Sequence, residues 1–221
     1  NNILSIILGN SELALDEEIT PLTEESLEEI KAASLRAKDI IKQLLSFSRK
    51  ADQEIQPLDI RPIVKESVKL IRASLPSNIS IQNRIHEFQK AVLADATQIH
   101  QVIINLCSNA ADAMPAGGRL EIEVEQVSFD SLPPERGIDL SPGDYLALRI
   151  RDNGSGIAPE IKEKIFDPYF TTKEVGKGSG MGLSVVIGIV KSHNGAIFAD
   201  SEPGQGSCFT VLLPTTSDGS Q

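Results

Sequence analysis

Three glycine clusters in the last third of the chain constrain its fold more than any other feature. Their sequences are Asp152-Asn-Gly-Ser-Gly-Ile157, Gly176-Lys-Gly-Ser-Gly-Met-Gly182 and Gly204-Gln-Gly-Ser207. Glycine reaches backbone angles that other residues avoid, and it leaves no side chain in the way of a ligand. The first cluster follows an expected strand, the second precedes an expected helix, and the third leads into another strand. The chain must therefore build several close loops at the ends of regular elements.

The first two clusters carry the polar groups of a candidate ligand site. Asp152 at a strand end can accept a hydrogen bond from an exocyclic amine such as that of adenine, while the plainer interpretation is an Asx-turn that closes the strand. The second cluster can cradle phosphates with backbone N–H groups, helped by Lys177, or it can be a flexible loop. It matches neither the P-loop pattern nor the dinucleotide-binding pattern Gly-x-Gly-x-x-Gly.

A helix expected over residues 97–114 adds two amides. Asn105 and Asn109 are four residues apart and share one face of an otherwise apolar helix. Buried amides need hydrogen-bond partners, which a neighbouring loop could supply. An asparagine carbonyl is also a suitable oxygen ligand for Mg²⁺, so both interpretations stay open at this stage.

The pattern of apolar residues predicts an α+β fold in three segments. Residues 1–52 form an antiparallel helical hairpin, residues 57–214 a two-layer α/β sandwich with a mixed sheet, and residues 215–221 a linker or tail. In the sandwich, helices are expected over 61–75, beginning at Pro62, over 97–114 and over 181–193. Strands are expected over 79–85, 91–95, 120–127, 145–150, 196–201 and 207–213.

The first segment has the spacing of a coiled-coil seam. Leu27, Ile30, Ser34, Ala37, Ile41, Leu44 and Ser48 follow one another at alternating intervals of three and four residues. Two helices cannot bury such a stripe alone, so pairing with a second copy into a four-helix bundle is expected. The alternative is a hairpin packed against its own domain.

Composition excludes some classes of function. The net charge of −10, the 4% aromatic content and the absence of Trp argue against nucleic-acid binding. The two cysteines lie far apart and are expected to be reduced, and no zinc-binding spacing exists. The longest apolar run is much shorter than the roughly 18 residues of a membrane span. Because the chain opens on Asn1 rather than Met, we expect a fragment of a longer protein. The fragment is expected to be cytoplasmic, with membrane contact only through missing upstream segments.

Five motifs in order resemble the ATP-binding domain of sensor histidine kinases, in the GHKL ATPase superfamily with its Bergerat fold. They are the helix with Asn109, the DNGSGI cluster, Ile165-Phe-Asp-Pro-Tyr-Phe-Thr-Thr-Lys173, GKGSGMGL and GQGSCF, which correspond to the N, G1, F, G2 and G3 boxes. The resemblance covers residues 57–214, and residues 1–50 resemble the family's dimerisation and phosphotransfer hairpin.

The resemblance implies ATP and Mg²⁺ as cofactors and assigns residue roles. Asn109 corresponds to the Mg²⁺ ligand, Asn105 to a residue beside the phosphates, and Asp152 to the adenine anchor. Asp112 stands where many members carry Lys or Arg, which removes one phosphate contact. The implied nucleotide-binding positions are Asn109, Asp112, Asp152, Gly154, Gly156, Phe170, Lys173, Lys177, Gly178, Gly180, Met181, Gly182, Leu183 and Thr210.

The phosphoacceptor region of the matching branch reads His-Asp-Phe-Asn-Asn-Ile-Leu, whereas this chain opens Asn1-Asn2-Ile3-Leu4. The resemblance therefore places the acceptor histidine just before residue 1, and His86, His100 and His193 are expected to be structural. Asn2 corresponds to a residue that orients water for dephosphorylation of the regulator.

Three hypotheses follow. The first is a homodimeric protein histidine kinase that passes the phosphoryl group to a response regulator receiver domain. The second is an ATP-driven clamp like the gyrase and Hsp90 relatives, which carry a water-activating Glu at the position of Asn105. An amide cannot take that proton, which favours the kinase. The third is a non-catalytic ATP-binding dimerisation module.

Overall fold

The computed structural model describes residues 54–88, 90–129, 140–173 and 180–216. It also describes Ile7, Gly9, Asn10, Ser11, Ala14, Thr23, Leu27, Glu28, Ile30, Lys31 and Ser34. The chain divides into two compact units, one made of Asn1–Gln53 with Thr171–Gly180 and one made of Glu54–Phe170 with Met181–Gln221. Each unit is considered by itself.

The first unit is helical at each described position of its N-terminal part. The Ser11 hydroxyl donates to the carbonyl of Ile7 at 2.9 Å, one helical turn earlier. Ser34 is buried, whereas Ile30 is exposed in this single chain. Most of the predicted hairpin, including Asn2 and the seam beyond Ser34, lies outside the described residues, so the hairpin and its dimer stay predictions.

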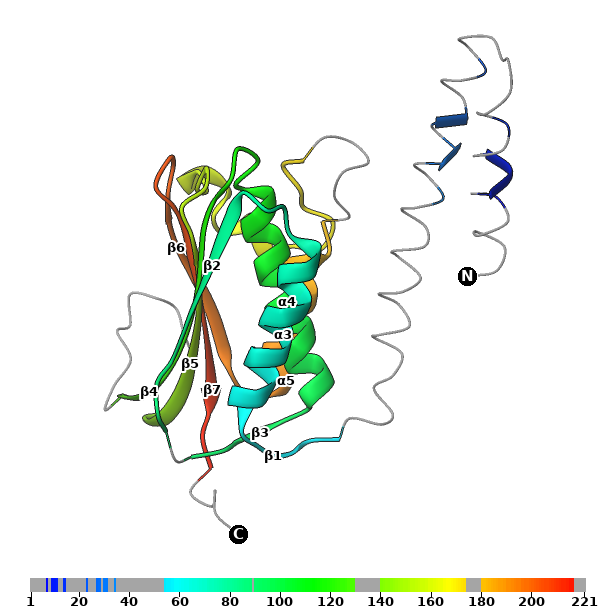
Figure 1. Ribbon diagram of the computed structural model, residues 1–221. Coiled ribbons are helices and arrows are strands. Elements are labelled where there is room, and N and C mark those ends of the chain that lie inside the picture. The colour runs from blue at the N-terminus through cyan, green and yellow to red at the C-terminus, as the bar shows by residue number, and fades with distance from the viewer. Residues whose placement is uncertain are drawn as a thin grey trace. The chain divides into compact units, whose positions relative to one another are not determined.

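The second unit is built on a five-stranded sheet in the order β2-β4-β5-β7-β6 (Figure 1). Its strands are β2 (Ile79–Ile85), β4 (Gly118–Phe129), β5 (Gly143–Asp152), β6 (Ala196–Glu202) and β7 (Gly206–Pro214). Strand β2 runs parallel to β4, and the other pairs are antiparallel. A separate antiparallel pair joins β1 (Gln56–Leu58) to β3 (Val92–Ala94).

Three helices cover one face of this sheet (Figure 1). They are α3 (Ile60–Ser74), α4 (Ala96–Asp112) and α5 (Gly182–Ser192), and two short 3₁₀ turns, η3 (Pro159–Ile161) and η4 (Lys164–Phe166), precede α5. One core of aliphatic side chains lies between the layers, and its fully buried members include Ile60, Ile79, Ile99, Ile103, Leu106, Leu120, Ile122, Leu148 and Ile150. The predicted α+β fold with a mixed sheet and two layers is confirmed.

Local sequence signals explain where the helices begin. Asp59 caps α3 by accepting from the Arg61 amide at 2.9 Å, and Asp95 caps α4 by accepting from the Thr97 and Gln98 amides at 2.8 and 3.1 Å. Aspartate is among the preferred N-cap residues because its carboxylate pairs an otherwise unbonded amide. Helix α3 therefore starts at Ile60 rather than at Pro62, which lies within its first turn.

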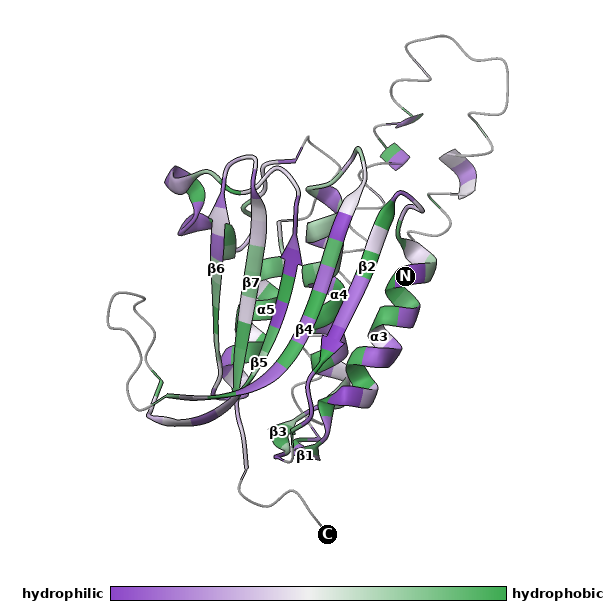
Figure 2. Ribbon diagram, turned by 60° about the vertical axis from the view of Figure 1, so that its left-hand side comes forward, coloured by the Kyte–Doolittle hydropathy of each residue, from purple (hydrophilic) through white to green (hydrophobic). Residues whose placement is uncertain are grey.

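The opposite face of the sheet is not covered by α3, α4 or α5. Hydrophobic and hydrophilic residues alternate along β4 (Figure 2). Leu120, Ile122 and Val124 are buried under the helices, and the glutamates between them lie on the open face. A small apolar cluster at one end of this face contains Tyr145, Ala147 and Leu212. None of the helices in the described part of the chain is long and apolar enough to span a bilayer.

Candidate functional site

The C-terminal end of β5 forms a corner around one buried carboxylate. Asp152 is 4% exposed, and its Oδ1 accepts hydrogen bonds from the amides of Gly154 at 2.8 Å and Ser207 at 3.3 Å. Among the described residues, no hydrogen bond reaches Oδ2. Burial raises the pKa of Asp152 above its ordinary range, and the two amide hydrogen bonds oppose that rise. The carboxylate therefore keeps an acceptor oxygen in a largely dehydrated position.

The glycines of this corner are required by close backbone contacts. Gly156 and Gly206 have φ angles of 69° and 87°, which favour glycine. A Cβ on Gly206 would lie 2.1 Å from the carbonyl oxygen of Asp152, and one on Gly156 would lie 2.0 Å from that of Glu202. No side chain larger than hydrogen fits at these two positions, so the first and third glycine clusters pack directly on each other.

Helix α4 meets the corner at its C-terminal end. The Ser155 amide donates to the Ala113 carbonyl at 3.0 Å, and a Cβ on Gly154 would lie 2.4 Å from the same oxygen. Asn105, Asn109 and Ala113 are spaced by four residues and so follow one stripe of the helix. The stripe leads from the two amides to the buried carboxylate.

The other end of that stripe meets the start of α5. The Nδ2 of Asn105 donates to the Gly182 carbonyl at 3.5 Å, and a Cβ on Gly182 would lie 3.8 Å from Nδ2 and 3.9 Å from Oδ1 of Asn109. Helix α5 begins at Gly182 without a side-chain cap. The first amides of a helix carry a partial positive charge and bind anions. The two asparagines therefore lie beside an anion-attracting helix end.

Three predicted apolar positions belong to the same unit. Phe170, Met181 and Leu183 are all half-buried, and Phe170 and Leu183 pack against the main core. The neighbouring Phe166 meets Phe209 edge to face, with ring centroids 6.5 Å apart. Together these contacts attach Phe166, Phe170 and the start of α5 to the core.

Other predicted positions are not brought to this group. Asp112 is exposed at the end of α4, and Lys173 and Gly180 fall in the first unit. Asn2, Lys177 and Gly178 lie outside the described residues. For these six positions, the predicted roles stay predictions.

Thr210 requires a correction. Its partners in the sheet register are Arg149 on β5 and Phe198 on β6, so its side chain lies on the open face, away from Asp152. The residue of β7 that donates to the Asp152 carboxylate is Ser207, which the sequence analysis placed in the third glycine cluster and at the start of an expected strand without giving it a role. The alternation of inward Phe209, Val211 and Leu213 provides the missing signal, because it places Ser207 inward and Thr210 outward.

His193 and His100 occupy ordinary structural positions. His193 is 3% exposed, its Nε2 accepts from the Asp95 amide at 3.1 Å, and its Nδ1 bonds the Ile189 carbonyl at 2.8 Å. His100 bonds the Ser67 hydroxyl at 2.7 Å and lies 3.4 Å from Glu66. Ser67, His100 and Glu66 thus follow one another as nucleophile, base and acid do in a hydrolytic triad. Ser67 is 0% exposed, however, so no substrate could reach its hydroxyl.

Comparison with protein families places this arrangement in a known group. Residues 94–217 match the family described as histidine kinase-, DNA gyrase B-, and HSP90-like ATPase. The match covers α4, the corner at Asp152 and both later glycine clusters.

Curated relatives include two sensor kinases. The chain is 36% identical over 215 residues to Sensor kinase CckA of Brucella abortus, covering 97% of this chain and 23% of that protein. It is 31% identical over 221 residues to Signal transduction histidine-protein kinase AtoS of Escherichia coli, covering 100% of this chain and 34% of that protein. The chain thus spans between about a quarter and a third of the length of these relatives.

Solved structures agree with the fold. The catalytic domain of histidine kinase ThkA is 29% identical, with a TM-score of 0.58 over 74% of this chain and 97% of that one. ThkA in complex with the response regulator protein TrrA gives a TM-score of 0.66 over 96% of this chain and 58% of that one, at 24% identity. The fold, the corner and the sequence match lead to one conclusion: the chain belongs to the family of histidine kinase-, DNA gyrase B- and HSP90-like ATPases.

Proposed function

We propose that this chain is the core of a protein histidine kinase in a two-component signalling system. It binds ATP with Mg²⁺, and its kinase activity moves the γ-phosphoryl group to a histidine and then to an aspartate of a response regulator. The names of the curated relatives support this reading, because they are sensor kinases rather than gyrases or chaperones. The observation that carries the proposal is the pair of amides on α4.

The buried corner suits adenine. An exocyclic amine is a hydrogen-bond donor, and Oδ2 of Asp152 is an acceptor without a partner among the described residues. Gly154, Gly156 and Gly206 pack against neighbouring backbone and so hold the loops around Asp152 in place. A carboxylate here also favours adenine over guanine, because guanine presents a carbonyl oxygen at the corresponding ring position.

The region where Asn105 and Asn109 of α4 meet the start of α5 can bind phosphates and a metal ion. Asn109 offers an amide oxygen of the kind that Mg²⁺ accepts, and the first amides of α5 favour negative charge. Mg²⁺ bound there would neutralise phosphate charge during transfer. Residues of this chain then orient the nucleotide, with Asp152 holding the base and α5 holding the phosphates.

The proposed reaction is transfer rather than hydrolysis. A hydrolase needs a general base to activate water, and Asn105 cannot accept a proton at neutral pH. Its Nδ2 is instead occupied by the Gly182 carbonyl, so it positions the start of α5. An ATP-driven clamp, the runner-up, would need a carboxylate at this place.

The proposal includes features beyond the described residues. Residues 1–52 form the homodimeric hairpin, the acceptor histidine is none of His86, His100 and His193, and Asn2 orients water for dephosphorylation of the regulator. The partner is a receiver domain, without nucleic acid, and the chain acts in the cytoplasm. The proposed nucleotide positions retain Asp112, Phe170, Lys173, Lys177, Gly178, Gly180, Met181 and Leu183, while Thr210 is left out.

Nucleotide binding tests the site. We expect Asn109→Ala to remove most of the Mg²⁺-dependent gain in ATP affinity, measured by calorimetry with and without Mg²⁺. Asn83→Ala is the matched control, because Asn83 is an exposed amide on β2. If Asn109→Ala keeps the full Mg²⁺ effect, Asn109 is not the metal ligand.

Phosphoryl transfer tests the reaction. The full gene product incubated with γ-labelled ATP should gain acid-labile, alkali-stable phosphate, which identifies phosphohistidine. Asn105→Ala should lower the rate of labelling without creating ATP hydrolysis. Release of inorganic phosphate without any labelled protein would support the clamp and contradict the kinase.

A further inference from the structure

The open face of the sheet carries a histidine and two glutamates that the nucleotide site does not use. Glu123 and Glu125 are neighbours on the same face of β4, and His86 directly follows β2. The His86 amide donates to the Val124 carbonyl at 2.9 Å, which holds the histidine backbone beside β4. All three side chains therefore leave the sheet on the side away from the helices.

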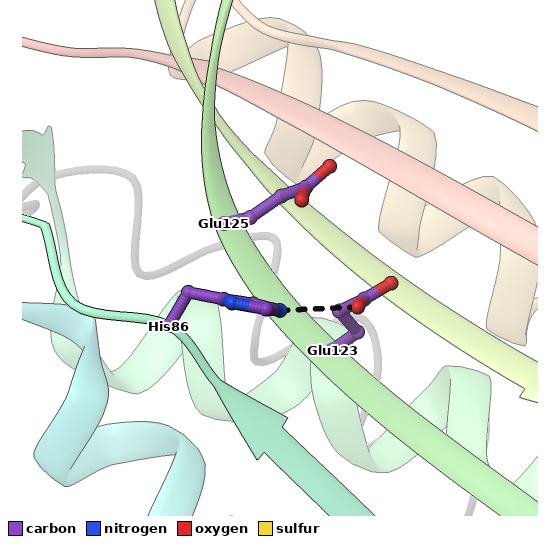
Figure 3. Close-up of side chains that lie close together, drawn as sticks. All are labelled: His86, Glu123 and Glu125. Carbon is purple, nitrogen blue, oxygen red and sulfur yellow. Dashed lines mark hydrogen bonds and ion pairs between the residues drawn. The ribbon is translucent and has the colours of Figure 1, made fainter.

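The three side chains lie close together, and His86 and Glu123 are hydrogen-bonded (Figure 3). His86 Nε2 lies 3.2 Å from Oε1 of Glu123, and one ligand atom from each of the three residues lies within 4.8 Å of the others. Both glutamates are only partly exposed. An imidazole and two carboxylates at this spacing are a set that divalent transition metals use.

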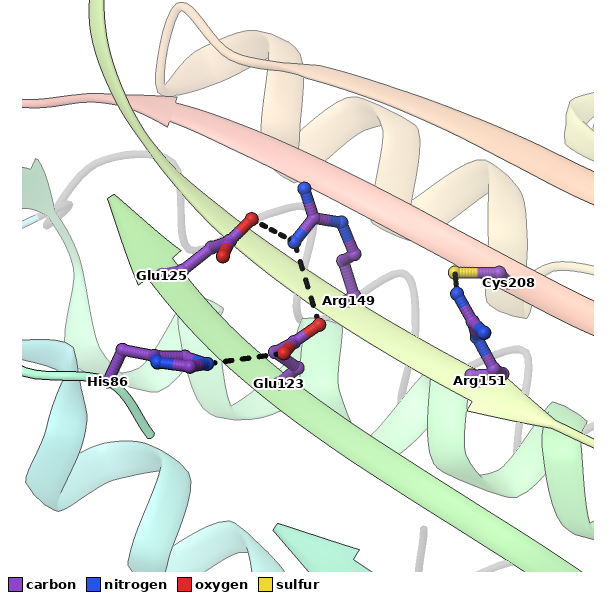
Figure 4. A network of polar contacts seen from close by, with 6 residues as sticks. All are labelled: His86, Glu123, Glu125, Arg149, Arg151 and Cys208. Carbon is purple, nitrogen blue, oxygen red and sulfur yellow. Dashed lines mark hydrogen bonds and ion pairs between the residues drawn. The ribbon is translucent and has the colours of Figure 1, made fainter. Parts of the chain in front are cut away.

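Arg149 orients the two carboxylates. It faces Glu123 across the β4–β5 pair, bonds Oε1 of Glu125 and lies 3.6 Å from Oε2 of Glu123 (Figure 4). One oxygen of each glutamate is thus directed to the arginine. The other two, Oε1 of Glu123 beside His86 Nε2 and Oε2 of Glu125, are not paired with Arg149 and could bind a cation together with the imidazole. Metal-binding carboxylates are commonly held by such outer hydrogen bonds, which fix the orientation of the ligand.

The geometry points to a binding site for a divalent transition-metal ion, with Zn²⁺ as the best match, formed by His86, Glu123 and Glu125. Two ligand atoms on a tetrahedral Zn²⁺ lie about 3.5 Å apart, given metal–ligand distances near 2.1 Å. His86 Nε2 and Glu123 Oε1, at 3.2 Å, already have about this spacing. The carboxylate of Glu125 needs to move by roughly 1 Å, which a partly exposed side chain can do by changing its rotamer.

The site differs from the proposed Mg²⁺ position in both place and chemistry. Asn109 belongs to a helix on the covered face, whereas this cluster lies on the open face. Imidazole selects transition metals over Mg²⁺, which prefers oxygen ligands. A metal here would join the end of the edge strand β2 to β4. The positive charge of Arg149 close by limits the affinity, so we expect micromolar rather than nanomolar binding.

Metal titration without nucleotide tests the site on the whole 221-residue chain. Calorimetry should show one Zn²⁺ bound per chain, and Co²⁺ should give the visible absorption of an ion with a nitrogen ligand. We expect His86→Asn and Glu125→Gln each to weaken Zn²⁺ binding roughly 10-fold or more. Millimolar Mg²⁺ should not displace the Zn²⁺.

Two control variants make the titration specific. Glu121→Gln changes a glutamate on the same face of β4 that pairs instead with Arg119 at 3.2 Å, and Cys208→Ser removes the half-buried thiol of this face. Both should bind Zn²⁺ like the parent chain, and Zn²⁺ should raise the Tm of these controls but not of His86→Asn. Equal Zn²⁺ binding by His86→Asn and the parent would overturn the proposal, whereas ATP binding by His86→Asn should stay unchanged.

Discussion

The two faces of the central sheet differ in chemistry, although the same strands form both: one face is apolar and buried, and the other is charged and partly exposed. Along β4, Leu120, Ile122 and Val124 are at most 1% exposed under the helices, while the intervening glutamates form ion pairs on the open face. Because side chains alternate along a strand, a shift of one residue exchanges these roles. Burial on one face supplies stability, and charge on the other face is available for binding.

The charged groups of the two faces also differ. Asp152, at the end of β5, lies under the helix layer, and burial raises the pKa of its carboxyl group. Glu123 and Glu125 are paired with Arg149 and His86 in partly exposed positions. A buried carboxylate without a charged partner costs stability even when amides donate to one of its oxygens, so a ligand explains its presence better than the fold does.

Truncation in the core should produce the largest effect. Ile122→Ala removes a side chain that is 1% exposed, and we expect a loss of about 2–4 kcal/mol in the free energy of unfolding, measured with denaturant. The adjacent Glu121→Gln, on the open face, should cost less than about 1 kcal/mol, because exposed ion pairs contribute little. Similar losses for both variants would abolish the contrast between the faces.

The two histidines His193 and His86 sharpen the comparison. His193→Phe leaves the Asp95 amide at the start of α4 without its acceptor, and we expect a loss of about 1–3 kcal/mol in stability. His86→Asn, on the open face, should change the stability by no more than about 0.5 kcal/mol in the absence of metal. If His193→Phe is as stable as the parent, its bond to Asp95 contributes nothing.

Asp152→Asn should separate stability from binding. We expect ATP to bind about 1–3 kcal/mol more weakly, because a charged acceptor is lost.

The same variant tests the pH dependence of stability. Folding raises the pKa of Asp152, so the contribution of this carboxyl group to the free energy of unfolding is greatest below its ordinary pKa of 3.8 and declines as the pH rises through the raised pKa. The variant should lose this decline, which denaturant unfolding at several pH values measures.

ATP binding by the parent should show the opposite dependence on pH. The ionised carboxylate accepts the adenine amine, so affinity should fall as the pH drops through the raised pKa of Asp152. Calorimetric titrations at several pH values test this, with Asp152→Asn as the control without that step. An identical pH profile in both proteins would contradict the role of Asp152.

The difference in thiol reactivity between the two cysteines is the smallest effect that we expect. Burial raises the pKa of Cys107 to about 12, so the thiol is protonated and shielded, whereas Cys208 lies half-buried on the open face beside Arg151. A thiol reagent should label one cysteine in the folded chain and two in denaturant. Fast labelling of Cys107 in the folded chain would show that the helix layer opens easily.

Much of this architecture follows from local patterns in the sequence. Strand 79–85 matches its prediction, and the helix predicted over 97–114 spans Ala96–Asp112. Both have clear periodicity, and Asp95 marks the start of the helix. Strand β1 was not predicted because it has three residues, two of them exposed, and contains Pro57. Its only signal is its pairing with β3, which is distant in the sequence.

The site was partly predictable for a different reason. Asn109 and Asp152 stand in motifs, so the resemblance identifies them without knowledge of the fold. The contact between Gly206 and the Asp152 carbonyl joins residues far apart along the chain, and no local pattern reveals it. The placement of Thr210 was wrong because the motif was read without counting the alternation of β7.

The backbone contact between the first and third glycine clusters has a consequence for the order of folding. The corner needs α4, the end of β5 and the β6–β7 turn together, and these segments are separated by long stretches of chain. Contacts between distant segments form late, after the entropy cost of closing the intervening loops has been met. Nucleotide should therefore slow unfolding while leaving the folding rate almost unchanged, because the transition state has not yet assembled the binding corner.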